Sequence, residues 1–146
     1  MQIEIKIDPL YDEPKVVVLT ASMTEEVHSL VEKLSEKNPS VISGIRDGMI
    51  TILEEDNLIK IYAGNGKVFA VTDHGEYSIK LRLYEIEKRL DSQRFVRISN
   101  SEIVNLKKVK NFDLSFTGTI CVELINNTVT YVSRRYVSKI KKILGI

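Results

Sequence analysis

Residues 95–109, FVRISNSEIVNLKKV, combine alternating apolar side chains with a high density of amides, hydroxyls and positive charge. Val96 and Ile98 alternate with Arg97 and Ser99, which is typical of a strand with one buried face. We expect a strand over 94–98 and then a turn of helix near 101–106. A strand that only filled a core would not need this polarity, so the stretch is a candidate contact surface.

The sequence on both sides of this stretch is typical of a small β-rich unit. The glycine-containing triplets at 64–66 and 73–75 predict hairpin turns. A short helix is expected over 82–90, and a basic helix, RRYVSKIKKIL, closes the chain and ends at Gly145. Strands are predicted at 41–46, 49–54, 58–63, 67–72, 76–80, 109–116, 119–125 and 128–132. The fold class is therefore mainly β (α+β).

Residues 1–39 are expected to form a separate accessory segment with a ββα order. The stretches 2–8 and 15–20 are predicted to be strands, because β-branched and other apolar residues alternate there or follow one another. A helix follows, with a capping box that begins at Ser22 and an end at Pro39. Its expected apolar face contains Met23, Val27, Leu30, Val31 and Leu34.

Charge is distributed unevenly along the chain, although the net charge is only +1. Residues 1–39 contain four Lys and eight Asp or Glu, whereas the part from Lys80 onward contains 14 basic and six acidic residues. The excess of positive charge fits either a surface that binds a polyanion or a solvated basic surface. The sequence contains no apolar run of membrane-spanning length and no signal peptide, and it has one cysteine, Cys121. We expect a cytoplasmic protein.

No set of residues with catalytic or metal-binding spacing is present in the sequence. His28 and His74 belong to no zinc-binding motif, and each is interpreted as a surface residue. Cys121 lies in a strand-like setting that does not activate a thiol. We therefore expect neither an enzyme nor a bound metal or cofactor.

Two polar motifs in the C-terminal part identify the kind of surface. The first is Phe95, Arg97, Ser99–Asn100–Ser101 and Ile103–Val104–Asn105, and the second is Ser133–Arg134–Arg135–Tyr136. In motif content, spacing and element order, residues 42–146 resemble the LytTR family of bacterial DNA-binding domains. The resemblance implies an elongated, layered β-fold with short helices that binds double-stranded DNA through loops in the major groove.

The resemblance also implies roles for individual residues. Asn100 and Arg135 correspond to residues that contact bases, and Asn and Arg suit bidentate contacts with adenine and guanine. A third loop, represented here by Asn65 and Lys67, approaches DNA in relatives. The side chains expected to contact phosphate are those of Arg97, Ser99, Ser101, Lys107, Lys108, Arg134 and Lys139.

Several of these residues also have structural interpretations. Arg97 could face either a phosphate or a carboxylate. Asn105 is expected to cap backbone groups in the core rather than to contact DNA. Tyr136 is expected to fasten the last helix to the sheet. A β-rich module that binds RNA or protein through the same basic face is the alternative function, although few aromatic side chains are placed to stack on bases.

These observations predict a sequence-specific transcriptional regulator with a LytTR-type DNA-binding domain at 40–146. Only 39 residues precede that domain, too few for a receiver domain, so we expect a stand-alone regulator. We also expect self-association, as a dimer on repeated sites. Stand-alone relatives are often accompanied by a membrane protein that restrains them, and the resemblance implies such a partner here.

Overall fold

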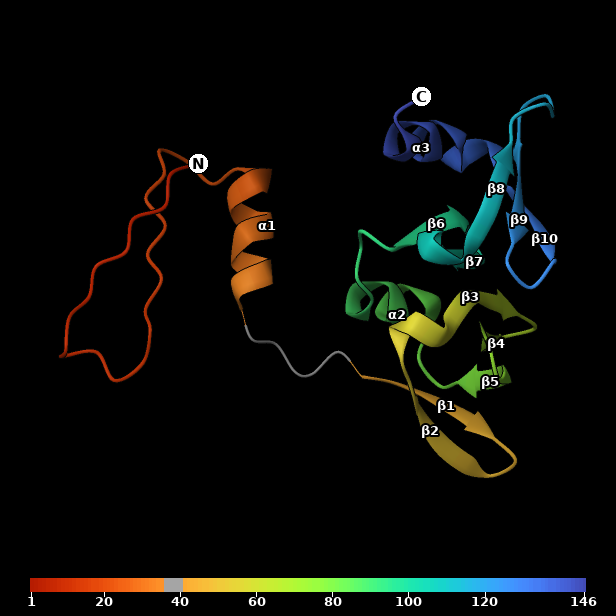
Figure 1. The fold of residues 1–146 in the computed structure, drawn as a ribbon, viewed down its shortest axis with the longest axis horizontal. Coiled ribbons are helices and arrows are strands. Elements are labelled where there is room, and N and C mark those ends of the chain that lie inside the picture. The colour runs from red at the N-terminus through yellow and green to blue at the C-terminus, as the bar shows by residue number, and fades with distance from the viewer. Residues whose placement is uncertain (36–40) are drawn as a thin grey trace. The chain divides into compact units, whose positions relative to one another are not determined.

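The computed structural model describes residues 1–35 and 41–146, and the chain divides into two units, Met1–Pro39 and Ser40–Ile146 (Figure 1). In the second unit, one sheet has the strand order β2-β1-β5-β4-β3-β7-β6 and the other has the order β10-β9-β8. Every strand pairing is antiparallel. The strands are β1 (Ile42–Arg46), β2 (Met49–Leu53), β3 (Leu58–Gly64), β4 (Lys67–Thr72), β5 (Gly75–Ile79), β6 (Phe95–Ser99), β7 (Glu102–Asn105), β8 (Val109–Asp113), β9 (Ile120–Leu124) and β10 (Val129–Val132).

Four helical segments accompany these strands in the second unit: η1 (Glu55–Asn57), α2 (Leu83–Arg89), η2 (Leu106–Lys108) and α3 (Arg134–Leu144). The mainly β fold class is confirmed, and the strands expected between residues 41 and 80 are present. The closing helix is also confirmed. It ends at Gly145, which adopts the left-handed conformation with φ of 74°.

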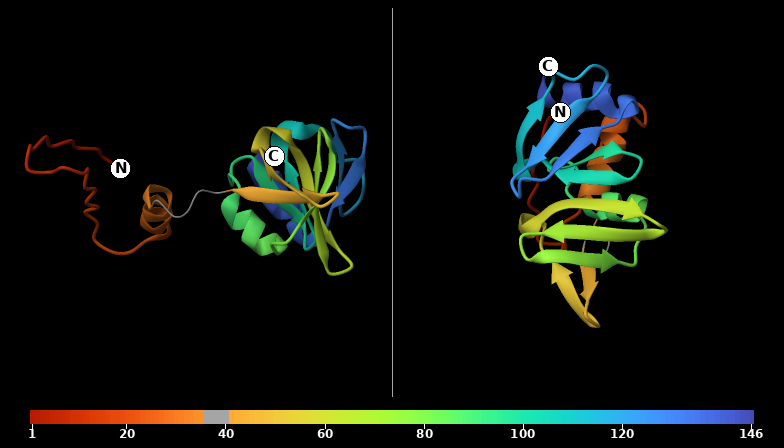
Figure 2. Two further views of the ribbon diagram at one scale, coloured as in Figure 1. Left: turned by 90° about the horizontal axis from the view of Figure 1, so that it is seen from below. Right: turned by 90° about the vertical axis from the view of Figure 1, so that its right-hand side faces the viewer.

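Strands β6 and β7 lie between two hydrophobic clusters, which explains the adjacent apolar residues in each strand, Phe95–Val96 and Ile103–Val104. Phe95 and Ile103 belong to the cluster that includes α2, whereas Val96 and Val104 belong to the cluster that includes β9 and α3. Figure 1 shows the β6–β7 layer between α2 on one side and α3 on the other. A second view shows the strands of this unit stacked as successive layers (Figure 2). Successive side chains of these strands therefore fill opposite cores.

The turn of helix predicted near 101–106 is wrong. Residues 102–105 form β7, and only the three residues that follow it, Leu106–Lys108, form a short 3-10 helix. Ile103 and Val104 are both completely buried, one on each face of the strand. Burial on both faces produces an apolar run that cannot be distinguished from a helical turn by periodicity.

In the first unit, the helix is confirmed but the predicted strands are not. Residues 1–24, all of which the structure describes, contain no strand at 2–8 or 15–20. Ile3 and Ile7 are more than 80% exposed, so the alternating side chains have no surface to cover there. Helix α1 (Glu25–Leu34) begins after Thr24, whose hydroxyl accepts a hydrogen bond from the Val27 amide at 3.3 Å, and not after Ser22. The helix end predicted at Pro39 lies outside the described residues.

Candidate nucleic-acid interface

The loop between β6 and β7 presents Asn100 at the edge of the seven-stranded sheet. Ser99 pairs with Glu102, so Asn100 and Ser101 form a tight two-residue connection. The Ser101 amide donates to the Ser99 hydroxyl at 3.2 Å, and the two hydroxyl oxygens lie 3.3 Å apart. This loop is therefore ordered by its own polar groups, while the Asn100 side chain remains exposed.

The first turn of α3 lies next to this loop. The Ser133 amide donates to the carbonyl of Ile98 at 2.9 Å, which fastens the start of the helix to β6. Tyr136 extends the junction, because its hydroxyl donates to Asn100 Oδ1 at 3.1 Å. The two motifs recognised in the sequence, 36 positions apart at Asn100 and Tyr136, thus meet directly in the folded chain.

Arg134 and Arg135 extend from the same helical turn into solvent. Both are exposed, and neither forms a hydrogen bond or ion pair with any residue that the structure describes. Lys139 is also exposed, four positions after Arg135 and therefore on the same side of the helix. No acidic residue occupies this first turn. The helix dipole disfavours cations at this end and favours anions such as phosphate.

The β3–β4 turn completes this edge. Asn65 and Gly66 have φ values of 53° and 74°, as in a type I′ hairpin turn, which confirms the predicted hairpin. The Ala63 amide donates to the Ser101 carbonyl at 2.8 Å, so this turn begins beside the Asn100 loop. We use the term loop edge for the three adjoining segments, residues 65–67, 99–101 and 133–136.

Arg97 is occupied by contacts within the protein. Its guanidinium lies 2.9–3.0 Å from the Glu87 carboxylate, and Arg97 Nη1 donates to the Asn100 carbonyl at 2.6 Å. The side chain of Arg97 is only 14% exposed. Of the two orientations considered for Arg97, the structure has the one that faces a carboxylate.

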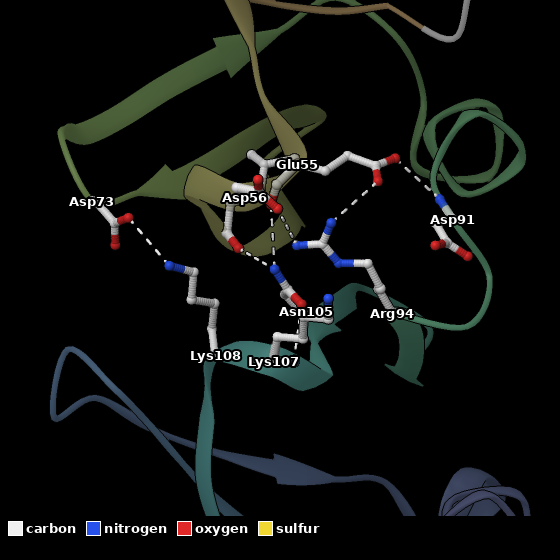
Figure 3. Close-up of polar contacts among 9 residues, drawn as sticks. Glu55, Asp56, Asp73, Asp91, Arg94, Asn105, Lys107 and Lys108 are labelled. Carbon is white, nitrogen blue, oxygen red and sulfur yellow. Dashed lines mark hydrogen bonds and ion pairs between the residues drawn. The ribbon is translucent and has the colours of Figure 1, made fainter.

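Lys107 and Lys108 lie at the opposite end of β7 from Asn100. Four strand residues at about 3.3 Å each separate the two ends by roughly 10 Å or more. Lys108 Nζ lies 3.3 Å from Asp73 in the β4–β5 turn (Figure 3). The structure therefore does not bring these two lysines together with the loop edge, although they are close to it in sequence.

Asn105 lies among polar residues at that far end of β7 (Figure 3). Its side chain is completely buried, its amide donates to the Leu58 and Glu55 carbonyls at 2.8 and 3.3 Å, and its Oδ1 accepts from the Lys107 amide at 3.0 Å. The expectation that Asn105 caps backbone groups in the core is confirmed.

An ion pair lies directly beneath the loop edge. Lys60 Nζ and Glu102 Oε1 are 3.0 Å apart, and both side chains are mostly buried. Glu102 Oε2 also accepts a hydrogen bond from Thr130 at 2.7 Å.

Tyr62, on the same strand as Lys60, donates a hydrogen bond to Glu76 at 2.5 Å. This hydrogen bond is the main reason that the pKa of Tyr62 is raised to about 12.

The described part of the chain shows neither a metal-binding group of side chains nor a membrane-spanning helix. No group of three or more His, Cys, Asp or Glu side chains in residues 1–35 and 41–146 lies close enough to hold a metal ion. His28 pairs with Glu32 on the surface of α1 at 3.3 Å, and His74 occupies a turn. Within the same residues, no helix combines the length and apolar character needed to cross a membrane.

Comparison with known proteins identifies the family of this chain. The sequence model of the LytTr DNA-binding domain matches residues 48–145. The chain belongs to the LytTR family. It is 33% identical, over its full length and 99% of theirs, to uncharacterized HTH-type transcriptional regulators of Staphylococcus aureus strains MSSA476 and MRSA252. Its fold resembles the LytTr DNA-binding domain of a response regulator from Bacillus cereus, with a TM-score of 0.70 at 23% identity over 73% of this chain and 97% of the other. It is therefore a DNA-binding protein.

The two staphylococcal relatives are named as helix-turn-helix regulators, but the LytTR fold is not a helix-turn-helix. That motif requires two consecutive helices joined by a turn of a few residues. In residues 41–146, strands β6 to β10 lie between α2 and α3. In this LytTR domain, exposed Asn100 is therefore carried by a loop, and exposed Arg134 and Arg135 are carried by the first turn of α3.

Two contacts that support the loop edge are not predicted from the sequence. Tyr136 was expected only to fasten α3, whereas its hydroxyl contacts Asn100. Glu87, which holds Arg97, was not singled out at all. These pairs are 36 and 10 positions apart, and only the folded arrangement reveals them.

Proposed function

We propose that this DNA-binding transcriptional regulator recognises specific sequences by placing its loop edge in the major groove of duplex DNA. The groove is about 12 Å wide and admits compact protein segments. The observation that carries the proposal is the contact between Asn100 and Tyr136, because it joins the two motif segments into one exposed surface. Asn100 and Arg135, both exposed there, are the proposed base readers.

The proposed phosphate contacts surround these two readers. Arg134 and Lys139 are exposed cations beside Arg135, and Ser99 and Ser101 flank Asn100. Asn65 and Lys67 provide a third approach from the β3–β4 turn. About five phosphate contacts correspond to a slope of roughly −4 to −5 for the logarithm of affinity against the logarithm of salt concentration.

Arg97 is better placed to support the loop than to contact phosphate, since its guanidinium is already engaged. Lys107 and Lys108 could contact phosphate only if the bound DNA extended past the far end of β7. The core of the proposed interface is therefore narrower than the run of basic residues in the sequence suggests.

The direct test is selection of bound duplexes from a random pool, followed by competition binding. We expect an enriched sequence motif, and Asn100→Ala and Arg135→Ala should each flatten the preference at one or two positions. A bidentate base contact contributes about 1–3 kcal/mol of discrimination. Equal affinity for all duplex sequences would refute the proposed mode of reading.

The proposed regulator acts in the cytoplasm, and it acts by binding DNA rather than by catalysis.

We further propose that it self-associates on repeated sites through its first unit. None of the residues of α1 is buried, and Val31 and Leu34 on its apolar face are 42% and 50% exposed. A short amphipathic helix gains most of its stability from covering such a face. From the family resemblance we also propose a membrane protein that restrains the regulator.

A further inference from the structure

We infer that Tyr136 is a positioning residue that sets the orientation of the Asn100 carboxamide before DNA is bound. This inference rests on the proposed function, in which Asn100 reads a base. An exposed asparagine on a turn rotates freely about its terminal torsion, which is broad and roughly two-fold. The Tyr136 hydroxyl, which donates to Oδ1 at 3.1 Å, favours one of those two orientations.

The ring of Tyr136 is itself held in place. It is half-buried and packs against the cluster that includes β6, β7, β9 and α3. Ile140, one helical turn later, is completely buried in the same cluster. The Ser133 amide fastens the start of the helix to Ile98. The hydroxyl that contacts Asn100 therefore projects from a rigid support.

The backbone of the same loop is held from the other side. Arg97 Nη1 donates to the Asn100 carbonyl at 2.6 Å, and Glu87 on α2 holds the guanidinium of Arg97. Main chain and side chain of Asn100 are thus restrained by different elements, α2 through Arg97 and α3 through Tyr136. Such prior ordering reduces the entropy lost on binding.

The hydrogen bond determines which groups Asn100 offers to a base. A carboxamide has one oxygen with two lone pairs and one nitrogen with two hydrogens. Tyr136 uses one lone pair of Oδ1, so Asn100 keeps one acceptor position and both donor hydrogens. That remaining set matches the donor and acceptor that adenine presents in the major groove.

The test compares Tyr136→Phe with Tyr84→Phe, each of which removes only a hydroxyl. Tyr84 is an exposed residue of α2 whose hydroxyl forms no hydrogen bond with any residue that the structure describes. Competition binding would measure affinity for the selected duplex and for its single-base variants. At the positions that Asn100→Ala flattens, Tyr136→Phe should reduce discrimination by about 3- to 10-fold, the range for one hydrogen bond. Tyr84→Phe should leave discrimination unchanged.

Two further readouts distinguish positioning from a purely structural role of Tyr136. If Tyr136 positions Asn100, Tyr136→Phe should leave the salt slope and the affinity for random duplex DNA at the wild-type level. It should also have no further effect on discrimination in an Asn100→Ala background. Equal weakening on all duplexes, or a lower melting temperature with intact discrimination, would overturn the inference. If Asn100→Ala flattens the preference and Tyr136→Phe does not, the inference fails and the proposed function stands. If neither variant changes the preference, both fail.

Discussion

Glu102 on β7 accepts a hydrogen bond from the Thr130 hydroxyl on β10 at 2.7 Å, and this contact joins the seven-stranded sheet to the three-stranded sheet. The other oxygen of the same carboxylate pairs with Lys60 at 3.0 Å. Glu102 is the first residue after the Asn100 loop, so the junction of the two sheets lies directly beneath the proposed reading surface.

Thr130→Val should therefore destabilise the DNA-binding unit. It leaves a mostly buried carboxylate oxygen without its donor, which should lower the free energy of unfolding in urea by about 1–2 kcal/mol. Thr51→Val is the matched control, because Thr51 is exposed on β2 and its hydroxyl makes no hydrogen bond within the described residues. Equal stability of the two variants would show that the Glu102 contact contributes nothing.

Asn105→Ala should be considerably more damaging than Asn111→Ala. The buried Asn105 side chain satisfies the Leu58 carbonyl and the Lys107 amide, and leaving both unpaired should cost about 2–4 kcal/mol. Asn111 bonds Glu123 on the surface, where loss of the contact is compensated by water. Denaturant unfolding measures both variants, and a similar small loss for each would contradict the assignment of Asn105 as a core cap.

Salt dependence should distinguish the loop edge from the far end of β7. Arg134→Ala and Lys139→Ala should each make the salt slope shallower by about one unit. The run of basic residues in the sequence predicts the same for Lys107→Ala, whereas the position of Lys107 in the structure predicts no change. Anisotropy titrations over a range of salt concentrations decide between these expectations. A shallower slope for Lys107→Ala would mean that bound DNA extends across the end of β7.

Ionisation of Tyr62 should reduce stability at high pH. Its hydrogen bond to Glu76 raises the pKa to about 12. A folded-state pKa above the unfolded value means that the stabilisation is complete below about pH 10 and is lost as pH rises from about 10 to 12. Urea unfolding at about pH 9 and about pH 11 should show a smaller decrease for Tyr62→Phe than for Tyr84→Phe. Identical decreases would refute the role of this hydrogen bond.

Self-association through the first unit predicts an asymmetry between the two faces of α1. Val31→Asp introduces a charge on the apolar face and should weaken self-association by about tenfold or more, since burying an unpaired charge is costly. Ser29→Asp adds the same charge on the opposite, exposed face and should have little effect. Analytical ultracentrifugation measures both. An unchanged oligomeric state for Val31→Asp would remove α1 from the interface.

The predictions that succeeded depended on local chemistry. The Asn65–Gly66 turn specifies its own hairpin, because both residues accept positive φ, and Gly145 ends the last helix for the same reason. The polar motif residues Asn100 and Arg135 are distinctive in type and spacing, and the structure shows both exposed, whereas their contact with bases stays a prediction. These features require no knowledge of distant parts of the chain.

The predictions that failed depended on what surrounds each segment. Strand β7 was expected to be helical because its burial on two faces removes the alternation by which strands are recognised. Residues 2–8 have a strand pattern but form no strand, since a pattern cannot supply a neighbour to pair with. For Lys107 and Lys108, the structure shows that β7 separates them from the Asn100 loop, which the sequence alone does not reveal, and their contact with phosphate stays a prediction.

The sharing of β6 and β7 between two cores has a consequence for how the DNA-binding unit unfolds. Phe95 and Ile103 support one cluster, and Val96 and Val104 support the other, from the same two strands. Unfolding of either cluster therefore removes strands that the other cluster packs against, so the two clusters should unfold in a single cooperative event. Slow-exchanging amides in β3 and β9 would then share one opening free energy, the global one. The Asn100 loop joins β6 and β7, so both of its anchoring strands should persist under thermal or chemical stress until that single event.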